Sequence, residues 1–368
     1  MKTRFSQKIK FTITVFIISL VASGNIYAHH SFAMFDRNNP TTLTGAVKIF
    51  RWTNPHSWVV LTVTNNDGSE TDWQLEHGPK NMLSRQGWDE STLKPGDLIS
   101  VEIHPLHNGE SGARFISFQA IDVEEDELVS QGGSTIFLIP PPDPVEMTPE
   151  VARNFNGIWV NASGGIHFDT SMGRREQMPP LKPEYMARWR QRQANADAGR
   201  STNDPTSQCL PAGFPRFLGM VYPGEILQTE HQINWFAEWG ESTVRIFLDG
   251  RPHPENSPLS YNGYTTGYWE GNTLLTHTIR MRDDTLIDTT GIPHSDQLTV
   301  SMRMQKLTPD YFEVEVTLED PVVFDRQWIT IKRYSRAPED FYIQEYSCFE
   351  GNRYQINEQG NVEMDIEN

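Results

Sequence analysis

The sequence is poor in cysteine, in positive charge and in long apolar runs. It has two cysteines among 368 residues, Cys209 and Cys348, and no second cysteine lies near either one to form a cysteine metal site. The formal net charge of −17 argues against nucleic acid or an anionic membrane surface as a partner, because the field repels polyanions. The sequence also has no phosphate-binding loop, dinucleotide fingerprint or haem attachment motif.

The amino terminus has the layout of a secretory signal peptide. Four basic residues precede an apolar run, 11–22, that is too short to span a bilayer, and a polar segment then ends at Ala28. Cleavage after Ala28 would remove four positive charges and no negative ones, taking the formal charge from −17 to −21. We therefore expect a periplasmic or secreted protein that starts at His29 and has no membrane span. The alternative is that residues 1–28 remain as an anchor.

The expected compartment also bears on the cysteines. In an oxidising environment an even pair is most simply one disulfide, Cys209–Cys348, which would close a long loop. The alternative is two free, buried thiols.

Residues 29–123 are expected to form a small OB-like barrel. Their polar and apolar residues alternate in short segments, and Asn66-Asp67-Gly68 is a hairpin turn signal. A short helical segment, 80–86, falls between the third and fourth of these segments, which is the element order of an OB fold. The five predicted strands are 42–50, 58–64, 71–75, 98–103 and 114–123.

Residues 124–151 are expected to be a linker, because an acidic run is followed there by four prolines within 140–144. Residues 152–368 then predict one helix, 181–198, and a larger barrel. Seven or eight antiparallel strands indicate a closed, lipocalin-like up-and-down barrel. The fold class predicted for the whole chain is therefore mainly β. The predicted strands of this half are 225–229, 232–238, 243–248, 267–280, 297–306, 312–318 and 328–334.

A mature amino-terminal histidine suggests a metal site. His29 would offer its amine and its imidazole as a chelate, and His56, in the segment 54–58, is a candidate further ligand. Nitrogen ligands of this kind suit copper. Six of the eleven histidines lie within residues 29–107. The alternative is that His29 and His30 are a polar lead-in and that His56 caps a strand.

The segment 249–296 is a second concentration of functional side chains. A histidine held near a carboxylate can act as a general acid or base, and prolines beside the two histidines would fix the backbone. Nearby aromatic residues could line a ligand site at the mouth of a barrel. The alternative is ordinary hairpin chemistry. The candidate catalytic residues are His253, His294, Asp249, Arg251 and Asp296, and the candidate ligand-binding residues are Tyr264, Tyr268 and Trp269.

Both halves contain motifs that resemble known domains. The first half has His29-His30-Ser31-Phe32, Asn54-Pro55-His56-Ser57-Trp58 and Leu93-Lys94-Pro95-Gly96-Asp97, and it resembles a family of exported bacterial domains of unknown function. The second half has Asp249-Gly250-Arg251-Pro252-His253 and Pro293-His294-Ser295, and it resembles an uncharacterised, lipocalin-like exported domain. Neither resemblance implies a reaction.

Three functions follow as hypotheses. The first is a periplasmic binding protein with a small apolar or aromatic molecule in the larger barrel. The second is a copper-binding module at the mature amino terminus. The third is an acid–base enzyme, an isomerase or hydratase, at the His253 and His294 loops. The sequence does not decide whether the protein is an enzyme.

Overall fold

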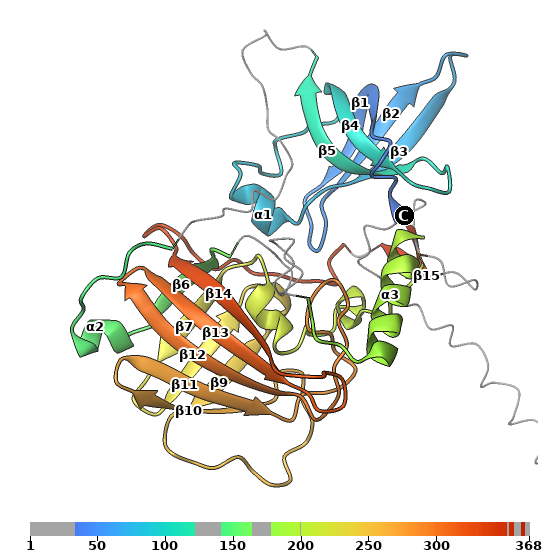
Figure 1. Ribbon diagram of the computed structural model, residues 1–368. Coiled ribbons are helices and arrows are strands. Elements are labelled where there is room, and N and C mark those ends of the chain that lie inside the picture. The colour runs from blue at the N-terminus through green and yellow to red at the C-terminus, as the bar shows by residue number, and fades with distance from the viewer. Residues whose placement is uncertain are drawn as a thin grey trace, which may run out of the picture.

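A computed structural model describes residues 34–121, 141–163, 178–198, 200–351, 353–356 and 362–364. Within these residues the chain is mainly β and forms two closed barrels, one of five strands and one of nine (Figure 1). The predicted signal peptide, His29 and most of the predicted linker lie outside the described residues. The predicted fold class is confirmed.

The smaller barrel has the strand order β1-β2-β3-β5-β4, and its helix α1 lies between β3 and β4 in the chain. Only the β3–β5 pair is parallel, and the other pairs are antiparallel. This is the predicted OB-like order. The elements are β1 (Thr41–Arg51), β2 (Trp58–Thr64), β3 (Glu70–Glu76), α1 (Lys80–Ser84), β4 (Leu98–Pro105) and β5 (Gly112–Ala120).

The strand β1 closes this barrel because it pairs with β2 on one side and β4 on the other. A Cβ atom at Gly45 would lie 2.4 Å from the backbone oxygen of Thr62, so the absence of a side chain lets the two strands approach. A bulge between Val47 and Ile49 adds to the bend of β1. Inward-facing residues such as Leu61 and Val101 are fully buried and form the core.

The larger barrel has the strand order β10-β11-β12-β13-β14-β6-β7-β8-β9. Its strands are β6 (Gly157–Asn161), β7 (Gly224–Gln228), β8 (Gln232–Ala237), β9 (Thr243–Phe247), β10 (Tyr264–Glu270), β11 (Thr273–Ile279), β12 (Thr299–Thr308), β13 (Tyr311–Glu319) and β14 (Trp328–Arg336). The other regular elements of this half are α2 (Pro149–Arg153), α3 (Pro183–Asp197), η3 (Pro205–Gln208), η4 (Arg216–Gly219), η5 (Trp239–Glu241), β15 (Tyr354–Ile356) and β16 (Val362–Met364).

Three details of the larger barrel correct the sequence prediction. The barrel has nine strands, whereas seven or eight were expected. The barrel closes through a short parallel contact between β9 and β10, whereas an entirely antiparallel barrel was expected. The segment 267–280, predicted as one strand, belongs to the hairpin of β10 and β11, which turns at Gly271 with a φ of 58°. Glycine adopts this left-handed conformation without a steric penalty.

The predicted helix is α3, which packs on the larger barrel through one face. Trp189 is buried and its indole nitrogen donates to the backbone oxygen of Thr290 over 3.0 Å. Tyr185 and Met186, one turn earlier, pack against the same core. Pro183 occupies the first turn, where a missing N–H costs nothing.

A C-terminal strap, residues 337–351, connects the two barrels after β14. A disulfide joins Cys348 in the strap to Cys209, with 5.5 Å between their Cα atoms, which confirms the predicted bond. Near its end, Glu350 pairs with Lys80 of α1 at 2.8 Å. The strap is therefore covalently attached to the larger barrel and hydrogen-bonded to the smaller one.

A side-chain ion pair forms a second, direct contact between the halves. Arg85, which follows α1, forms a bidentate pair with the fully buried carboxylate of Glu238, with a distance of 2.8 Å to Oε1. The same carboxylate accepts from the backbone nitrogen of Gln344 in the strap over 2.9 Å. Glu238 thus links the larger barrel, the strap and the smaller barrel.

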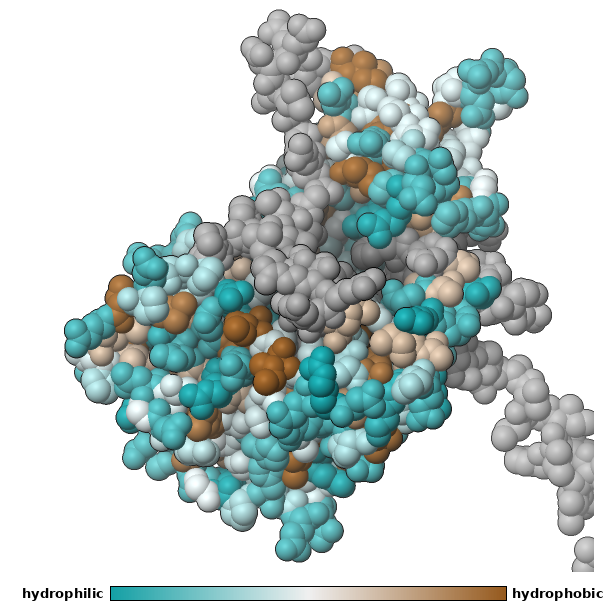
Figure 2. All heavy atoms as spheres, viewed as in Figure 1, coloured by the Kyte–Doolittle hydropathy of each residue, from teal (hydrophilic) through white to brown (hydrophobic). Residues whose placement is uncertain are grey.

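Hydrophilic residues cover most of the face shown in Figure 2, and hydrophobic residues appear there in small groups. No helix in the described ranges is long and apolar enough to cross a bilayer.

Candidate functional site

A cluster of charged and aromatic side chains lies where β2, β3 and β5 meet. We call His56, Glu76, His77 and Arg114 the histidine cluster. The hairpin register pairs Trp58 with Glu76, and the parallel β3–β5 register pairs Glu76 with Arg114. His56 lies two residues before Trp58, so the fold brings it to the end of β3.

Glu76 organises the cluster from a fully buried position. Its Oε1 lies 2.8 Å from Nδ1 of His56 and 3.6 Å from Nη1 of Arg114. Because a carboxylate only accepts, Nδ1 of His56 carries the proton. The backbone oxygen of His77 lies 3.3 Å from the same nitrogen. The ring of His56 is therefore held in one orientation, and Nε2 is the ring nitrogen that could bind a metal.

The side chain of His77 is buried beside His56 and Glu76, and it packs against aromatic rings. Its ring stacks on Phe115 with 4.4 Å between centroids and meets Trp88 edge-on at 4.8 Å. Burial lowers the pKa of His77 to about 3, so its imidazole is neutral at ordinary pH. Its Nε2 is buried and has no hydrogen-bond partner among the described residues.

The strap covers the part of the smaller barrel next to the cluster. Trp58 Nε1 donates to the backbone oxygen of Gly351 over 3.2 Å, and the backbone nitrogen of Asn54 donates to Glu350 over 3.1 Å. The guanidinium of Arg353 lies 5.1 Å from the Trp58 ring centroid. The turn that carries His56 is therefore anchored from outside its own domain.

The two histidines predicted for acid–base chemistry have different neighbours. His253 is partly exposed, with Nε2 3.1 Å from the backbone oxygen of His277 and Nδ1 3.3 Å from Oγ1 of Thr266. His294 is buried, with Nε2 2.8 Å from Oγ1 of Thr285. In the described part of the chain no hydrogen bond or ring contact joins His253 to His294.

Asp249 and Arg251, two of the residues predicted to act with the histidines, interact with each other. Asp249 and Arg251 form an ion pair within their own turn, with Arg251 Nε 2.8 Å from Oδ1, and this pair lowers the pKa of Asp249 to about 2. The Arg251 guanidinium also lies 4.2 Å from the Phe247 ring centroid. Asp296 is exposed. The acid–base hypothesis stays a prediction, and these contacts do not assemble the residues it names.

The three predicted ligand-binding aromatics lie on opposite faces of β10. Tyr264 stacks on Phe247 at 5.1 Å and Tyr268 is 63% exposed, so both face outward. Trp269 instead packs against the core and stacks on Phe155 at 6.1 Å. Because side chains alternate along a strand, residues 268 and 269 cannot face the same ligand.

Large rings occupy part of the interior of the larger barrel. The fully buried Phe312 ring has its centroid 4.7 Å from Trp159, 4.8 Å from Tyr334 and 5.1 Å from Phe155. The hypothesis of a small ligand inside this barrel stays a prediction, and no contact described here favours it.

The structure describes only one of the two residues predicted to bind a metal. His29 lies outside the described residues, whereas His56 lies in the histidine cluster. Within the described ranges, no group of three or more His, Cys, Asp or Glu side chains is arranged to hold a metal ion. A metal bound at His56 would therefore need ligands from elsewhere in the chain.

The sequence pattern did not predict that Glu76, His77 and Arg114 lie beside His56. The sequence does indicate the position of Glu76. If the two strands beside the predicted turn Asn66-Asp67-Gly68 pair residue by residue, Trp58 lies opposite Glu76, as it does in the structure. No comparable signal indicated Arg114, because it reaches the cluster through the parallel β3–β5 contact.

The fold and the cluster define a two-barrel β protein with an OB-like amino-terminal domain. The segment 17–115 matches a family described as being of unknown function, DUF6152. The matched segment includes every member of the histidine cluster and also His29. No curated protein matches the chain. The resemblance of the second half to lipocalin-like exported domains stays a prediction.

Proposed function

We propose that this is an exported protein whose amino-terminal barrel binds copper through His56 and the mature amino-terminal His29. The observation that supports it is the position of Nδ1 of His56, which lies 2.8 Å from Oε1 of Glu76 and is hydrogen-bonded to the backbone oxygen of His77 over 3.3 Å. Histidines that bind metals commonly donate their second ring N–H to a carboxylate or a backbone carbonyl, which fixes the tautomer and raises the basicity of the ligating nitrogen. Glu76 and the backbone oxygen of His77 offer His56 both kinds of acceptor.

Chain connectivity supports the second ligand. The first described residue is Met34, whose backbone oxygen accepts from the nitrogen of His107 over 2.9 Å, just beyond the end of β4. The strand β4 pairs with β5, which pairs with β3, so Met34 lies a few strand spacings from Glu76. His29 precedes Met34 by five positions, and an extended segment of that length spans up to roughly 17 Å.

The ligand set would be the amine and imidazole of His29 and the imidazole of His56. Nitrogen ligands suit copper, which stands highest among the common divalent ions in affinity for such sites. Glu76 and Arg114 would orient His56 without binding the metal. Export supports the amine ligand, because cleavage after Ala28 would create it.

The experiment compares the mature protein, beginning at His29, with a variant extended by three glycines before His29, so that no histidine stands at the second or third position and no other amino-terminal copper motif is created. The extension keeps every side chain but moves the free amine, so we expect copper affinity, measured by competition with a chromogenic chelator, to fall at least about 100-fold. His56→Ala should cause a similar loss, and Glu76→Gln a loss of about 10–100-fold.

His231→Ala removes an exposed histidine of the larger barrel and serves as the matched control, with unchanged affinity expected. Unchanged affinity in both the glycine-extended protein and His56→Ala would refute the proposal. Circular dichroism of each variant checks that the barrel is folded.

A further inference from the structure

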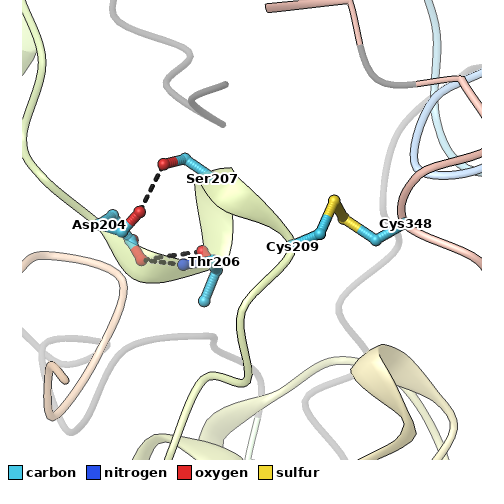
Figure 3. Close-up of a disulfide and its surroundings, with 5 residues drawn as sticks. All are labelled: Asp204, Thr206, Ser207, Cys209 and Cys348. Atoms are coloured by element: carbon cyan, nitrogen blue, oxygen red, sulfur yellow. Dashed lines mark hydrogen bonds between the residues drawn. A yellow bond between two sulfur atoms is a disulfide. The ribbon is translucent and has the colours of Figure 1, made fainter. Parts of the chain in front are cut away.

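The disulfide attaches the strap to a well-anchored turn of the larger barrel. Before η3, the buried carboxylate of Asp204 accepts from the backbone nitrogen of Thr206 over 3.0 Å and from its hydroxyl over 2.9 Å (Figure 3). The same carboxylate pairs with the buried Arg216 over 2.8 Å. Figure 3 shows that this turn leads directly into Cys209 and so to Cys348. The larger barrel therefore sets the position of Cys348.

Strap residues on both sides of Cys348 are connected to Asn54 of the smaller barrel. After the cysteine, the carboxylate of Glu350 accepts from the backbone nitrogen of Asn54 over 3.1 Å. Before it, the backbone oxygen of Glu345 accepts from Nδ2 of Asn81 over 3.2 Å. Asn81 in turn accepts from Nδ2 of Asn54 over 2.9 Å, and both asparagines are fully buried. The strap thus reaches Asn54 by two routes.

Gly351 of the strap packs on the same turn. A Cβ atom at Gly351 would lie 2.5 Å from Oγ1 of Thr53, and this hydroxyl donates to the backbone oxygen of His56 over 2.7 Å. On the other side of His56, Nε1 of Trp58 donates to the backbone oxygen of Gly351 over 3.2 Å. The strap therefore contacts the segment 53–58 before and after His56.

We propose that the Cys209–Cys348 disulfide is a redox-controlled clamp on the segment 53–58, which carries His56. Glu350 and Gly351 are held to the smaller barrel by single hydrogen bonds and one partly exposed ion pair with Lys80. Each such contact contributes little by itself. The disulfide favours all of them together, because it keeps the strap at a high effective concentration beside the segment. When the bond opens, residues 347–351 leave the segment for part of the time.

The chemical step is an ordinary thiol–disulfide exchange. Cys209 and Cys348 are both half-buried, so a dithiol reductant can reach the bond. One thiolate of the reductant attacks one sulfur and displaces the other cysteine, and the second thiolate of the reductant then releases the first. The protein gains two electrons and two protons as two thiols, while the reductant becomes a disulfide.

A loosened segment should weaken the copper site. A ligand that is not held in place must be ordered when the metal binds, and this ordering reduces affinity. The ring of His56 keeps its contacts with Glu76 and His77, so we expect a loss of only about 3–10-fold. This consequence rests on the copper function proposed above, whereas the loosening of the segment does not.

The principal experiment measures hydrogen exchange by NMR in the full mature protein, without copper, before and after addition of a dithiol reductant. The amide of Asn54 and the indole N–H of Trp58 both donate to the strap, so we expect them to exchange at least about 10-fold faster after reduction. The amides of β13, in the larger barrel, are the internal reference and should not change. Equal exchange before and after reduction, or an equal acceleration in β13, would overturn the proposal.

Two variants test the clamp without reductant. Gly351→Ala keeps the disulfide but places a methyl group against Thr53, so it should accelerate exchange at Asn54 and Trp58. Ser347→Ala changes an exposed residue of the strap and is the matched control, with wild-type exchange expected. Wild-type exchange in Gly351→Ala would contradict the role given to this contact.

The copper consequence is measured separately on the protein carrying Cys209→Ser and Cys348→Ser. No reductant is added, because thiols themselves bind copper. We expect copper affinity about 3–10-fold below that of the disulfide-bonded protein. If the disulfide-bonded protein binds no copper, the proposed function fails, while faster exchange after reduction still supports the clamp. Unchanged affinity beside faster exchange would overturn the link between the clamp and the copper site.

Discussion

His294 is a histidine that burial keeps neutral. Burial lowers its pKa, although Asp320, Asp283 and Asp284 act in the opposite direction. Nδ1 lies 3.0 Å from the backbone oxygen of Ser295, so the neutral ring is already hydrogen-bonded. Protonation must therefore occur more readily in the unfolded chain than in the folded protein.

This difference predicts loss of stability in acid. The unfolded chain binds the proton of residue 294 below about pH 6.5, whereas the folded protein does not until a lower pH. The free energy of unfolding should therefore fall by up to about 1.4 kcal/mol per pH unit as pH drops below that value, and this contribution should be fully present above it. Urea titrations of wild type and His294→Gln between pH 7.5 and 5 measure the difference in slope.

The exposed His231 provides the control, since His231→Gln should keep the wild-type slope. The assignment to His294 fails if the two glutamine variants show the same pH dependence.

Single residues also show where sequence reasoning succeeds. His56 was selected because a histidine follows Asn54-Pro55, and the structure places it against a buried carboxylate. His253 and His294 were grouped because they are close in sequence. His253, however, lies in the loop between β9 and β10 and contacts the β10–β11 hairpin, whereas His294 is buried within the loop between β11 and β12.

At the scale of elements, the strand β1 carries the bend that closes the smaller barrel. Alternating polarity and turn residues were enough to predict this barrel, because most of its antiparallel pairs join strands that are consecutive in sequence. The closing contact of the larger barrel was not predictable in the same way. Only Thr265 and Thr266 of β10 pair with β9. The two strands are parallel, and a long loop separates them in sequence.

Gly45→Ala tests the bend of β1. The added methyl group would meet the backbone oxygen of Thr62, which cannot move away without disturbing the β1–β2 ladder. We expect the free energy of unfolding of the smaller barrel to fall by about 1–3 kcal/mol. Hydrogen exchange of the β1 and β2 amides measures this loss.

Thr42→Ala changes an exposed residue of the same strand and should stay within about 0.5 kcal/mol of wild type. Equal protection of β1 in the two variants would show that the close approach at Gly45 is not required.

For the whole molecule, the strap determines how the two barrels are joined. It is tied to the larger barrel by the disulfide, which has a sequence separation of 139 residues, and to the smaller barrel through Glu350 and Gly351. Tyr346 is buried against Trp239 and Tyr222, with a ring distance of 5.5 Å to the latter. The halves are thus coupled by a segment that belongs in sequence to neither barrel core.

Replacing both cysteines by serine should loosen this coupling. Opening a loop of this length costs up to about 5 kcal/mol in the chain-entropy picture, and about 2–5 kcal/mol is typical for a native disulfide. We expect faster hydrogen exchange at residues 344–351 and a larger radius of gyration in solution scattering.

Lys80→Ala breaks only a partly exposed ion pair with Glu350 and should cost no more than about 1 kcal/mol. If the double serine variant has the same exchange rates and dimensions as Lys80→Ala, the disulfide does not hold the barrels together.

The position of Cys348 also sets an order of events during biosynthesis. Ribosomes make the chain from its amino terminus, so both barrels are complete before the strap, and with it the partner of Cys209, becomes available. A nascent or truncated chain that ends after β14 would carry both barrels but lack this disulfide. The bond can therefore form only after both barrels have been synthesised, and its formation reports that synthesis has passed residue 348.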